Sequence, residues 1–159
     1  MAATSLRPIT HKEKPHVMKI LKETPEFLPP EVVVAEDLID AYLEDPVASG
    51  YYIYIAEHEG TVAGYICYGN TPLTEATWDI YWVAVDHDKQ GFGIGRSLMQ
   101  HAEEDIKRMH GKLIMVETSG KPEYNKTRQF YDRLNYQRMC QIPEYYAPGD
   151  DLVLFSKRV

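Results

Sequence analysis

Residues 90–96 read Gln90-Gly91-Phe92-Gly93-Ile94-Gly95-Arg96, a glycine-rich turn between a predicted strand and a predicted helix. Residues 76–85 before the turn are rich in β-branched and aromatic side chains, which favour a strand. After the turn, apolar side chains recur at helical spacing to about residue 110, at Ile94, Leu98, Ala102, Ile106 and Met109. A compact apolar strand follows at residues 112–118. This order predicts two parallel strands joined by a right-handed crossover.

The three glycines let the backbone turn tightly and let a ligand come close to its amide groups. At the N-terminus of a helix, such amides and the helix dipole favour an anion. The nucleotide P-loop pattern GxxxxGK[ST] does not occur, and the spacing here is GxGxG rather than the GxGxxG of dinucleotide-binding folds. The remaining alternative is a tight strand-to-helix connection that binds nothing.

Outside this unit, the hydrophobic pattern predicts strands at residues 5–9, 51–58, 61–68, 136–142 and 152–157 and helices at residues 11–23, 30–43 and 124–134. Glu59-Gly60 predicts a hairpin between two of the strands. Together these elements indicate an α+β fold, with about four helices beside a mixed sheet of six to seven strands. The sheet is expected to be mostly antiparallel with one parallel pair.

Length and composition favour one globular domain over residues 1–159. The chain is 44% hydrophobic and 26% charged, and it shows no internal repeat. A chain of this size buries roughly 70% of its unfolded surface, so a disulfide or metal is not needed to stabilise it. Cys67 and Cys140 have no CxxC spacing, which fits a reducing cytoplasm. The six histidines show no metal-ligand spacing, so no metal is expected.

The net charge of −7 argues against nonspecific nucleic-acid binding, which needs a basic face. No apolar run approaches the roughly 20 residues of a membrane span, and residues 1–8 lack the long apolar segment of a signal peptide. We therefore expect a cytoplasmic protein without a membrane or nucleic-acid partner. An acidic surface instead attracts a cationic small molecule or peptide.

Two motifs together resemble a known family. Gln90-x-x-Gly93-x-Gly95 after a strand looks like the coenzyme A loop of the GNAT N-acetyltransferases. Downstream, Phe130-Tyr131-Asp132-Arg133-Leu134-Asn135-Tyr136 resembles the FYxxLGF element of that family, with Asn135 and Tyr136 in place of Gly and Phe. The resemblance extends over roughly residues 52–159. It implies a GNAT-like sheet whose two parallel strands splay apart, and acetyl-CoA as the cosubstrate.

The resemblance also implies which residues bind the coenzyme. Backbone amides from Gln90 to Arg96 would hold the pyrophosphate, with Arg96 adding positive charge. The pantetheine arm would lie between the splayed strands and pair with the backbone of Val83 and Val85. The amide of Val83 would then polarise the thioester carbonyl. The full set of coenzyme-binding residues is Val83, Val85, Gln90, Gly91, Phe92, Gly93, Ile94, Gly95 and Arg96.

For the chemistry, the resemblance assigns Tyr131 as the general acid that protonates the departing thiolate. A primary amine is almost fully protonated at pH 7, so a base is needed before it can attack. Glu117, on the second splayed strand, resembles the strand glutamate that serves as a base in some family members. Asp79, Glu75 and a water chain to a distant carboxylate remain open as alternatives.

The acceptor is expected to be an amine, on a small molecule or on a peptide or protein. Tyr145–Asp151 reads as a rigid aromatic and acidic loop between the last two strands, and in the family this region borders the acceptor pocket. Tyr145, Tyr146 and Asp150 are therefore the predicted acceptor contacts, through aromatic faces and carboxylate. The exposed last strands are also compatible with a homodimer. The alternative function is a noncatalytic acyl-CoA-binding or sensing module on the same fold.

Overall fold

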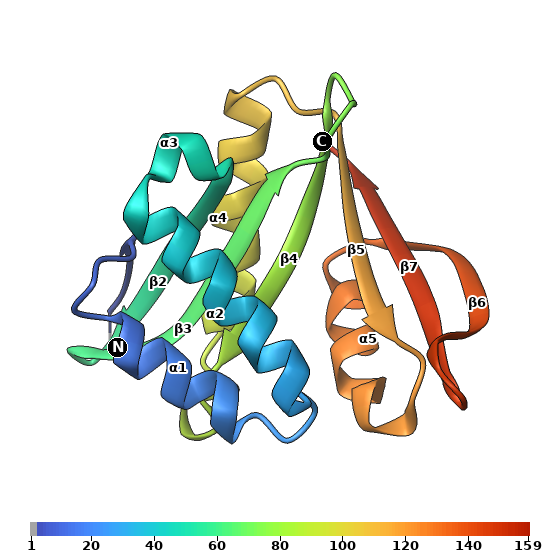
Figure 1. The fold of residues 1–159 in the computed structure, drawn as a ribbon, viewed down its shortest axis with the longest axis horizontal. Coiled ribbons are helices and arrows are strands. Elements are labelled where there is room, and N and C mark those ends of the chain that lie inside the picture. The colour runs from blue at the N-terminus through green and yellow to red at the C-terminus, as the bar shows by residue number, and fades with distance from the viewer. Residues whose placement is uncertain (1–2) are drawn as a thin grey trace.

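A computed structural model describes residues 3–159, and within them seven strands form one sheet (Figure 1). In sheet order the strands are β1 (Thr4–Pro8), β2 (Tyr51–His58), β3 (Thr61–Asn70), β4 (Thr77–Val85), β5 (Leu113–Ser119), β7 (Asp150–Arg158) and β6 (Gln137–Ala147). Of the pairings in the described part of the chain, only that of β4 with β5 is parallel. The predicted mixed sheet is confirmed.

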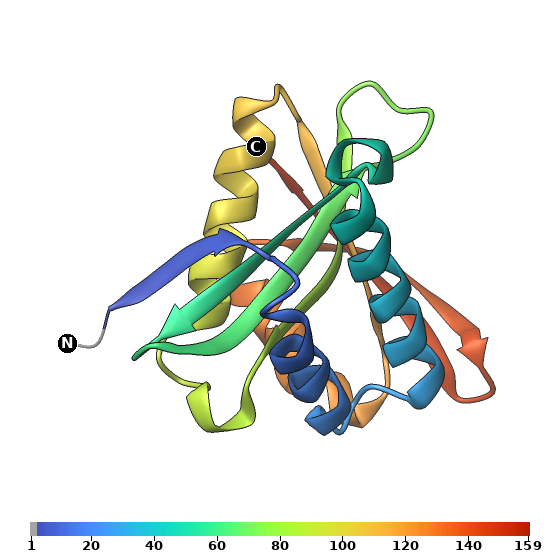
Figure 2. The ribbon, with the colours of Figure 1, turned by 60° about the vertical axis from the view of Figure 1, so that its left-hand side comes forward.

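Helices cover both faces of this sheet, and their bounds are α1 (Lys14–Glu23), α2 (Pro29–Glu44), α3 (Pro46–Ser49), α4 (Ile94–Arg108) and α5 (Asn125–Arg133). Two short 3₁₀ helices, η1 (His87–Lys89) and η2 (Pro122–Tyr124), precede α4 and α5. Figure 2 shows α2 and α4 on opposite sides of the sheet. Among the residues described, no helix is long and apolar enough to cross a membrane.

The single turn α3 was not expected from the sequence, which predicted about four helices. Asp45 caps it by accepting a hydrogen bond from the amide of Ala48 at 3.1 Å, and Gly50 ends it in the left-handed region at φ 73°. A one-turn helix has no hydrophobic periodicity, so only its caps mark it. The predicted hairpin at Glu59-Gly60 is present, with both residues at positive φ.

Two apolar layers fix the helices to the sheet. On one face, α1 and α2 pack on β2, β3 and β4 through buried side chains that include Leu21, Ile39, Ile53 and Tyr65. On the other face, α4 and α5 pack through Leu98, Ile106, Tyr131 and Phe155, among others. The amphipathic stripes of the helices account for this arrangement, because each stripe needs one face of the sheet. The outer face of β5, β7 and β6 carries no helix in Figure 1.

The parallel pair separates soon after it begins. β4 and β5 pair only from Thr77 to Asp79, opposite Leu113 to Met115. Beyond this register β4 runs on to Val85 and β5 to Ser119, and the two strands diverge (Figure 1). We call the space between the diverging strands the wedge. The splayed parallel pair expected from the resemblance is therefore present.

The end of the sheet differs from the prediction. The loop predicted over Tyr145–Asp151 is wrong, because Tyr145 and Tyr146 belong to β6 and Asp150 begins β7. Ala147 pairs with Asp150, which leaves only Pro148 and Gly149 in the turn. The register shifts between Ile142 and Ala147, so β6 does not keep the strict alternation that marks a strand in sequence. β6 is also an edge strand and exposed along its length.

Candidate active site

The glycine turn presents free backbone donors at the start of α4. Gly91 and Gly93 have φ values of 85° and 78°, in the left-handed region that residues with a Cβ atom rarely adopt. Gly93 is the N-cap of α4 and supplies no side chain to bond the first amides of the helix. Unpaired amides at the positive end of a helix dipole form an anion-binding site. Arg96, three residues after Gly93, is exposed.

The turn follows β4 and the short helix η1, and the last residues of β4 direct backbone groups toward the wedge. The amide of Asp86 donates to the carbonyl of Ala63 in β3 at 2.7 Å. Alternate residues of a strand point their N–H groups to opposite sides, so those of Val83 and Val85 point away from β3. The parallel pairing with β5 has already ended at Asp79. The N–H and C=O groups of Val83 and Val85 therefore face the wedge.

Tyr131 lies on the α5 face of the sheet, in an aromatic cluster. Its ring centroid is 5.4 Å from those of Phe130 and Phe155 and 5.9 Å from that of Tyr136, and the residue is 5% exposed. Burial raises the pKa of Tyr131 above its ordinary value, which keeps it a neutral phenol at pH 7. Within residues 3–159 its hydroxyl makes no hydrogen bond closer than 3.5 Å. A proton donor is thus left free of protein partners.

Glu117 lies on the opposite face. Along β5, Ile114, Val116 and Thr118 are buried, whereas Glu117 points to the other side of the strand. Desolvation and the nearby charge of Asp79 raise the pKa of Glu117 above its ordinary value. Asp79 itself accepts a hydrogen bond from the hydroxyl of Thr71 at 2.6 Å. The two carboxylates therefore form an acidic pair at the point where β4 and β5 part.

The predicted acid and base are thus separated by the sheet and meet only through the wedge. Tyr131 belongs to the core beneath α4 and α5, and Glu117 faces the opposite side of the sheet, the side of Leu113 and Met115. Glu75 precedes the first paired residue of β4, so it lies at the closed end of the wedge. The arrangement brings Asp79 near Glu117 and leaves Glu75 apart from both.

The predicted acceptor residues lie at the end of the β6–β7 hairpin. The rings of Tyr145 and Tyr146 pack edge to face with centroids 5.0 Å apart. Burial, and then the nearby charge of Glu117, raise the pKa of Tyr146 above its ordinary value. Asp150 accepts a hydrogen bond from Ser119 and lies 3.8 Å from the amine of Lys121. This ion pair leaves Asp150 with less free charge than the sequence suggested.

Sequence reasoning missed two features of the site. One is a bulge in β4: Cys67 pairs with Trp82 and Tyr68 with Ile80, which leaves Tyr81 without a partner in β3. Burial, and then the charge of Asp79, raise the pKa of Tyr81 to about 12. The other is Tyr124, which contacts the segment between α1 and α2. A bulge within a run of apolar residues does not change the hydrophobic pattern, so the sequence does not reveal it. A contact between residues far apart in the chain has no local sequence signal.

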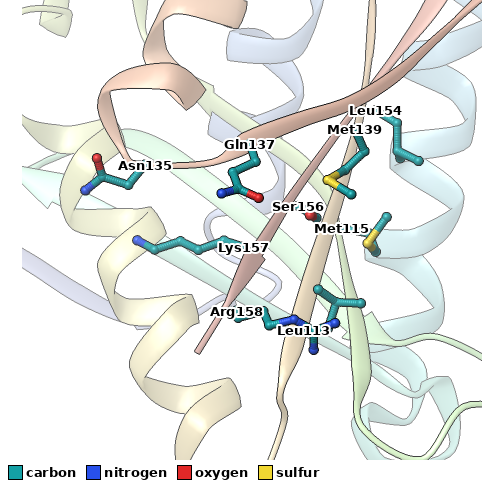
Figure 3. A pocket seen from close by; sticks show the side chains of 9 residues that line it. All are labelled: Leu113, Met115, Asn135, Gln137, Met139, Leu154, Ser156, Lys157 and Arg158. Carbon is teal, nitrogen blue, oxygen red and sulfur yellow. The ribbon is translucent and has the colours of Figure 1, made fainter.

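A separate pocket of about 630 Å³ lies on the helix-free face of β5, β7 and β6 (Figure 3). Its walls include Met115, Met139 and Leu154, with Lys157 at one side. Leu113 and Met115 alternate along β5 with the buried Ile114 and Val116, which places the pocket on the outer face. None of the predicted site residues lines this pocket.

The chain is similar to known acetyltransferases. The family described as "Acetyltransferase (GNAT) domain" matches residues 49–138. A putative acetyltransferase of the GNAT family from Desulfovibrio desulfuricans is 34% identical, with a TM-score of 0.92 over 98% of this chain and 99% of that one. An uncharacterized N-acetyltransferase of Methanocaldococcus jannaschii is 31% identical over 66% of this chain and 65% of its own length.

A more distant structure has the same fold. A putative acetyltransferase from Salmonella typhimurium, solved with its cofactor acetyl-CoA, is 17% identical with a TM-score of 0.78. The match covers 98% of this chain and 94% of that one. At this level of identity the likeness concerns the fold.

Proposed function

The chain belongs to the GNAT acetyltransferase family, and from this we propose that it transfers the acetyl group of acetyl-CoA to a primary amine. The amine attacks the thioester directly while both substrates are bound, without a covalent enzyme intermediate. One observation carries the proposal: backbone donors of Val83, of Val85 and of the first residues of α4 are left unpaired beside a gap in the sheet.

These donors suit a coenzyme with a diphosphate and an amide-bearing arm. The amides at the start of α4 would hold the diphosphate, because the helix dipole and unpaired N–H groups both favour negative charge there. The arm would enter the wedge and pair with Val83 and Val85 as an additional strand. Binding by local amides also explains how an acidic protein accommodates a polyanion.

Acetylation of a bound ammonium needs two protons removed from its nitrogen and one supplied to the leaving sulfur. Glu117 is proposed to accept the proton of the bound ammonium, whose nitrogen then forms a bond to the carbonyl carbon. Stabilisation of the tetrahedral oxyanion by the amide of Val83 would correspond to about 2.7–4 kcal/mol. The carbon–sulfur bond breaks, and Tyr131 gives its proton to the leaving sulfur. The nitrogen then gives its second proton to the tyrosinate, which restores the phenol of Tyr131, and Glu117 releases the first proton to solvent. The two faces of the sheet thus hold the base and the acid on opposite sides of the reacting carbon.

Unpaired carboxylates favour a cationic acceptor. Among the ion pairs of residues 3–159, none involves Asp79, Glu117, Glu26 or Glu31. Burial, and then the charges of Glu31, Asp150 and Glu26, raise the pKa of Tyr124, so these groups gather on one side. Tyr145 and Tyr146 add aromatic faces that attract cations. We propose that Tyr145, Tyr146 and Asp150 contact the acceptor.

Three amines that differ only at one end test the proposal: 1,4-diaminobutane, n-butylamine and 4-aminobutanoate. Thiol release from acetyl-CoA is measured with each amine in turn. The expected order of kcat/KM is the diamine first, the alkylamine second and the amino acid last. Since an exposed charge pair corresponds to about 0.2–1 kcal/mol, the steps are expected to be up to about fivefold. The reverse order would contradict a cationic acceptor.

The noncatalytic alternative makes a different prediction. An acyl-CoA-binding module would bind acetyl-CoA in calorimetry and release no thiol with any amine or with lysine-containing peptides. Thiol release that depends on an amine would eliminate it. Absence of both acetyl-CoA binding and thiol release would refute the proposed function itself.

A further inference from the structure

The segment between α1 and α2 is attached to both sides of the wedge. We call residues 24–28 the strap. Phe27 packs edge to face on Trp82 of β4, with ring centroids 5.4 Å apart at 84°. The hydroxyl of Tyr124, which follows β5, donates a hydrogen bond to the carbonyl of Glu26 at 2.8 Å. One attachment belongs to the β4 side and the other to the β5 side, so the strap crosses between them.

The attachment on the β5 side is rigid. Tyr124 is 7% exposed. The guanidinium of Arg128 fixes the preceding loop by donating to the carbonyls of Ser119 and Lys121 at 2.7 and 2.9 Å. Burial and the surrounding carboxylates raise the pKa of Tyr124, so its hydroxyl keeps its proton. Tyr124 is therefore a fixed donor and not a mobile surface side chain.

The other hydrogen bonds of the strap stay on the helical side. The hydroxyl of Thr24 donates a hydrogen bond to the carbonyl of Ile20, and the amide of Phe27 donates one to the carbonyl of Thr24. The amide of Leu28 donates to the carboxylate of Glu31. Among the described residues, the bond from Tyr124 is the one hydrogen bond that joins the strap to the β5 side. Without it, the strap would keep its local shape but lose its position across the wedge.

We propose that Tyr124 is a positioning residue for the amine acceptor, because its hydroxyl holds the strap over the face of the wedge that carries Glu117. This inference rests on the proposed function. The strap lies on the face of α1 and α2, whereas the glycine turn opens α4 on the other face. A preorganised wall lowers the ordering that binding requires. Tyr124 therefore governs acceptor affinity and leaves coenzyme affinity alone.

Tyr124→Phe removes the hydroxyl and keeps the ring. With 1,4-diaminobutane as the probe, KM for the amine is expected to rise about two- to tenfold, the usual range for one hydrogen bond. The kcat and the Kd of acetyl-CoA should stay within about twofold. The matched control is Tyr68→Phe, which removes a buried hydroxyl bonded to Asp105 at 2.6 Å. It should lower Tm without changing KM for the amine.

Three kinetic results would overturn the proposal: an unchanged KM for the amine, a fall in acetyl-CoA affinity of the same size, or an equal rise in KM in Tyr68→Phe. Hydrogen exchange provides a second test that needs no turnover. In Tyr124→Phe the amides of residues 26–28 should exchange faster, while those of α5 stay protected. Unchanged exchange in the strap would also overturn it. If the unmodified protein acetylates no amine, the proposed function fails, and exchange alone decides the role of Tyr124.

Discussion

Tyr131 is the residue whose chemistry can be isolated most cleanly. Its hydroxyl has no protein partner in the described chain, so Tyr131→Phe removes a proton donor and little else. We expect kcat to fall about 10²-fold or more, the usual contribution of a general acid, with the Kd of acetyl-CoA within about twofold. Steady-state kinetics and calorimetry measure the two quantities.

Tyr65→Phe is the control for this prediction. Tyr65 is also buried, and its hydroxyl has no partner in the described residues, but it belongs to the core beneath α1 and α2. Loss of this hydroxyl should leave kcat unchanged. If Tyr131→Phe weakens acetyl-CoA binding instead of turnover, the assignment of Tyr131 as the acid is wrong.

The pH profile tests Glu117. Desolvation and Asp79 raise its pKa above the ordinary value of 4.5, and only the ionised form can accept a proton. The kcat should therefore fall as the pH drops through this raised pKa, on a limb that lies above pH 4.5. Glu117→Gln should lower kcat and abolish the limb. A limb that survives in Glu117→Gln would assign the base elsewhere.

The variant Asp79→Asn tests which of the two carboxylates, Asp79 or Glu117, is the base. Removing the charge of Asp79 removes one of the two causes that raise the pKa of Glu117. The acid limb of kcat should then move to lower pH while the reaction continues. If the limb and most of the activity disappear together, Asp79 and not Glu117 is the base.

At the scale of elements, the glycine turn is expected to bind the coenzyme through backbone amides that its left-handed residues orient. An added Cβ at Gly93 meets nothing within 4 Å, so the cost of Gly93→Ala is the left-handed φ of 78°. This conformation costs a residue with a side chain about 1–2 kcal/mol, and relieving it re-aims the amides of the turn. We expect the Kd of acetyl-CoA to rise about tenfold, which corresponds to a similar free energy.

Gly50→Ala is the matched control, because Gly50 has a φ of 73° and open space around it but caps α3. Both variants should lose a similar free energy of unfolding in urea. Only Gly93→Ala should weaken acetyl-CoA binding. Equal coenzyme affinities in the two variants would show that the turn does not hold the ligand.

The elements that were predicted correctly are those with a strong local period. The stripe of α4 and the hairpin at Glu59-Gly60 are examples, since spacing and turn residues determine both. The bulge at Tyr81 and the extended β6–β7 hairpin were missed, because register depends on the partner strand. After α4 the left-handed position is taken by His110, at φ 65°, and Gly111 follows it.

Gly111 is required for a different reason. An added Cβ there would lie 2.3 Å from Ile106 and 2.8 Å from the ring of Trp78. The position is therefore one of close packing between α4 and β4, which the sequence alone does not reveal.

The site, too, could be predicted only in part from the sequence. The motif identified Tyr131 and the glycine turn, but Tyr124 and Glu26 are 98 positions apart and only the fold joins them.

At the scale of the whole molecule, the net charge of −7 should affect the binding of the amine more than the binding of acetyl-CoA. Raising the ionic strength from about 20 to 200 mM screens the attraction of the acidic face for 1,4-diaminobutane, so its KM should rise several-fold. Binding of acetyl-CoA depends on local amides, and its KM should change less than about twofold. A large loss of acetyl-CoA affinity with an unchanged amine KM would contradict this division.

The homodimer expected from the sequence stays a prediction. Sedimentation velocity measures the oligomeric state and tests it.

A crystal structure with acetyl-CoA tests the central claim most directly. The account predicts that the diphosphate contacts the amides of residues 90–96 and that the pantetheine arm lies in the wedge, paired with Val83 and Val85. The thioester should lie between Tyr131 and Glu117. Coenzyme bound outside an empty wedge, for example in the pocket beside Met115 and Leu154, would contradict the account.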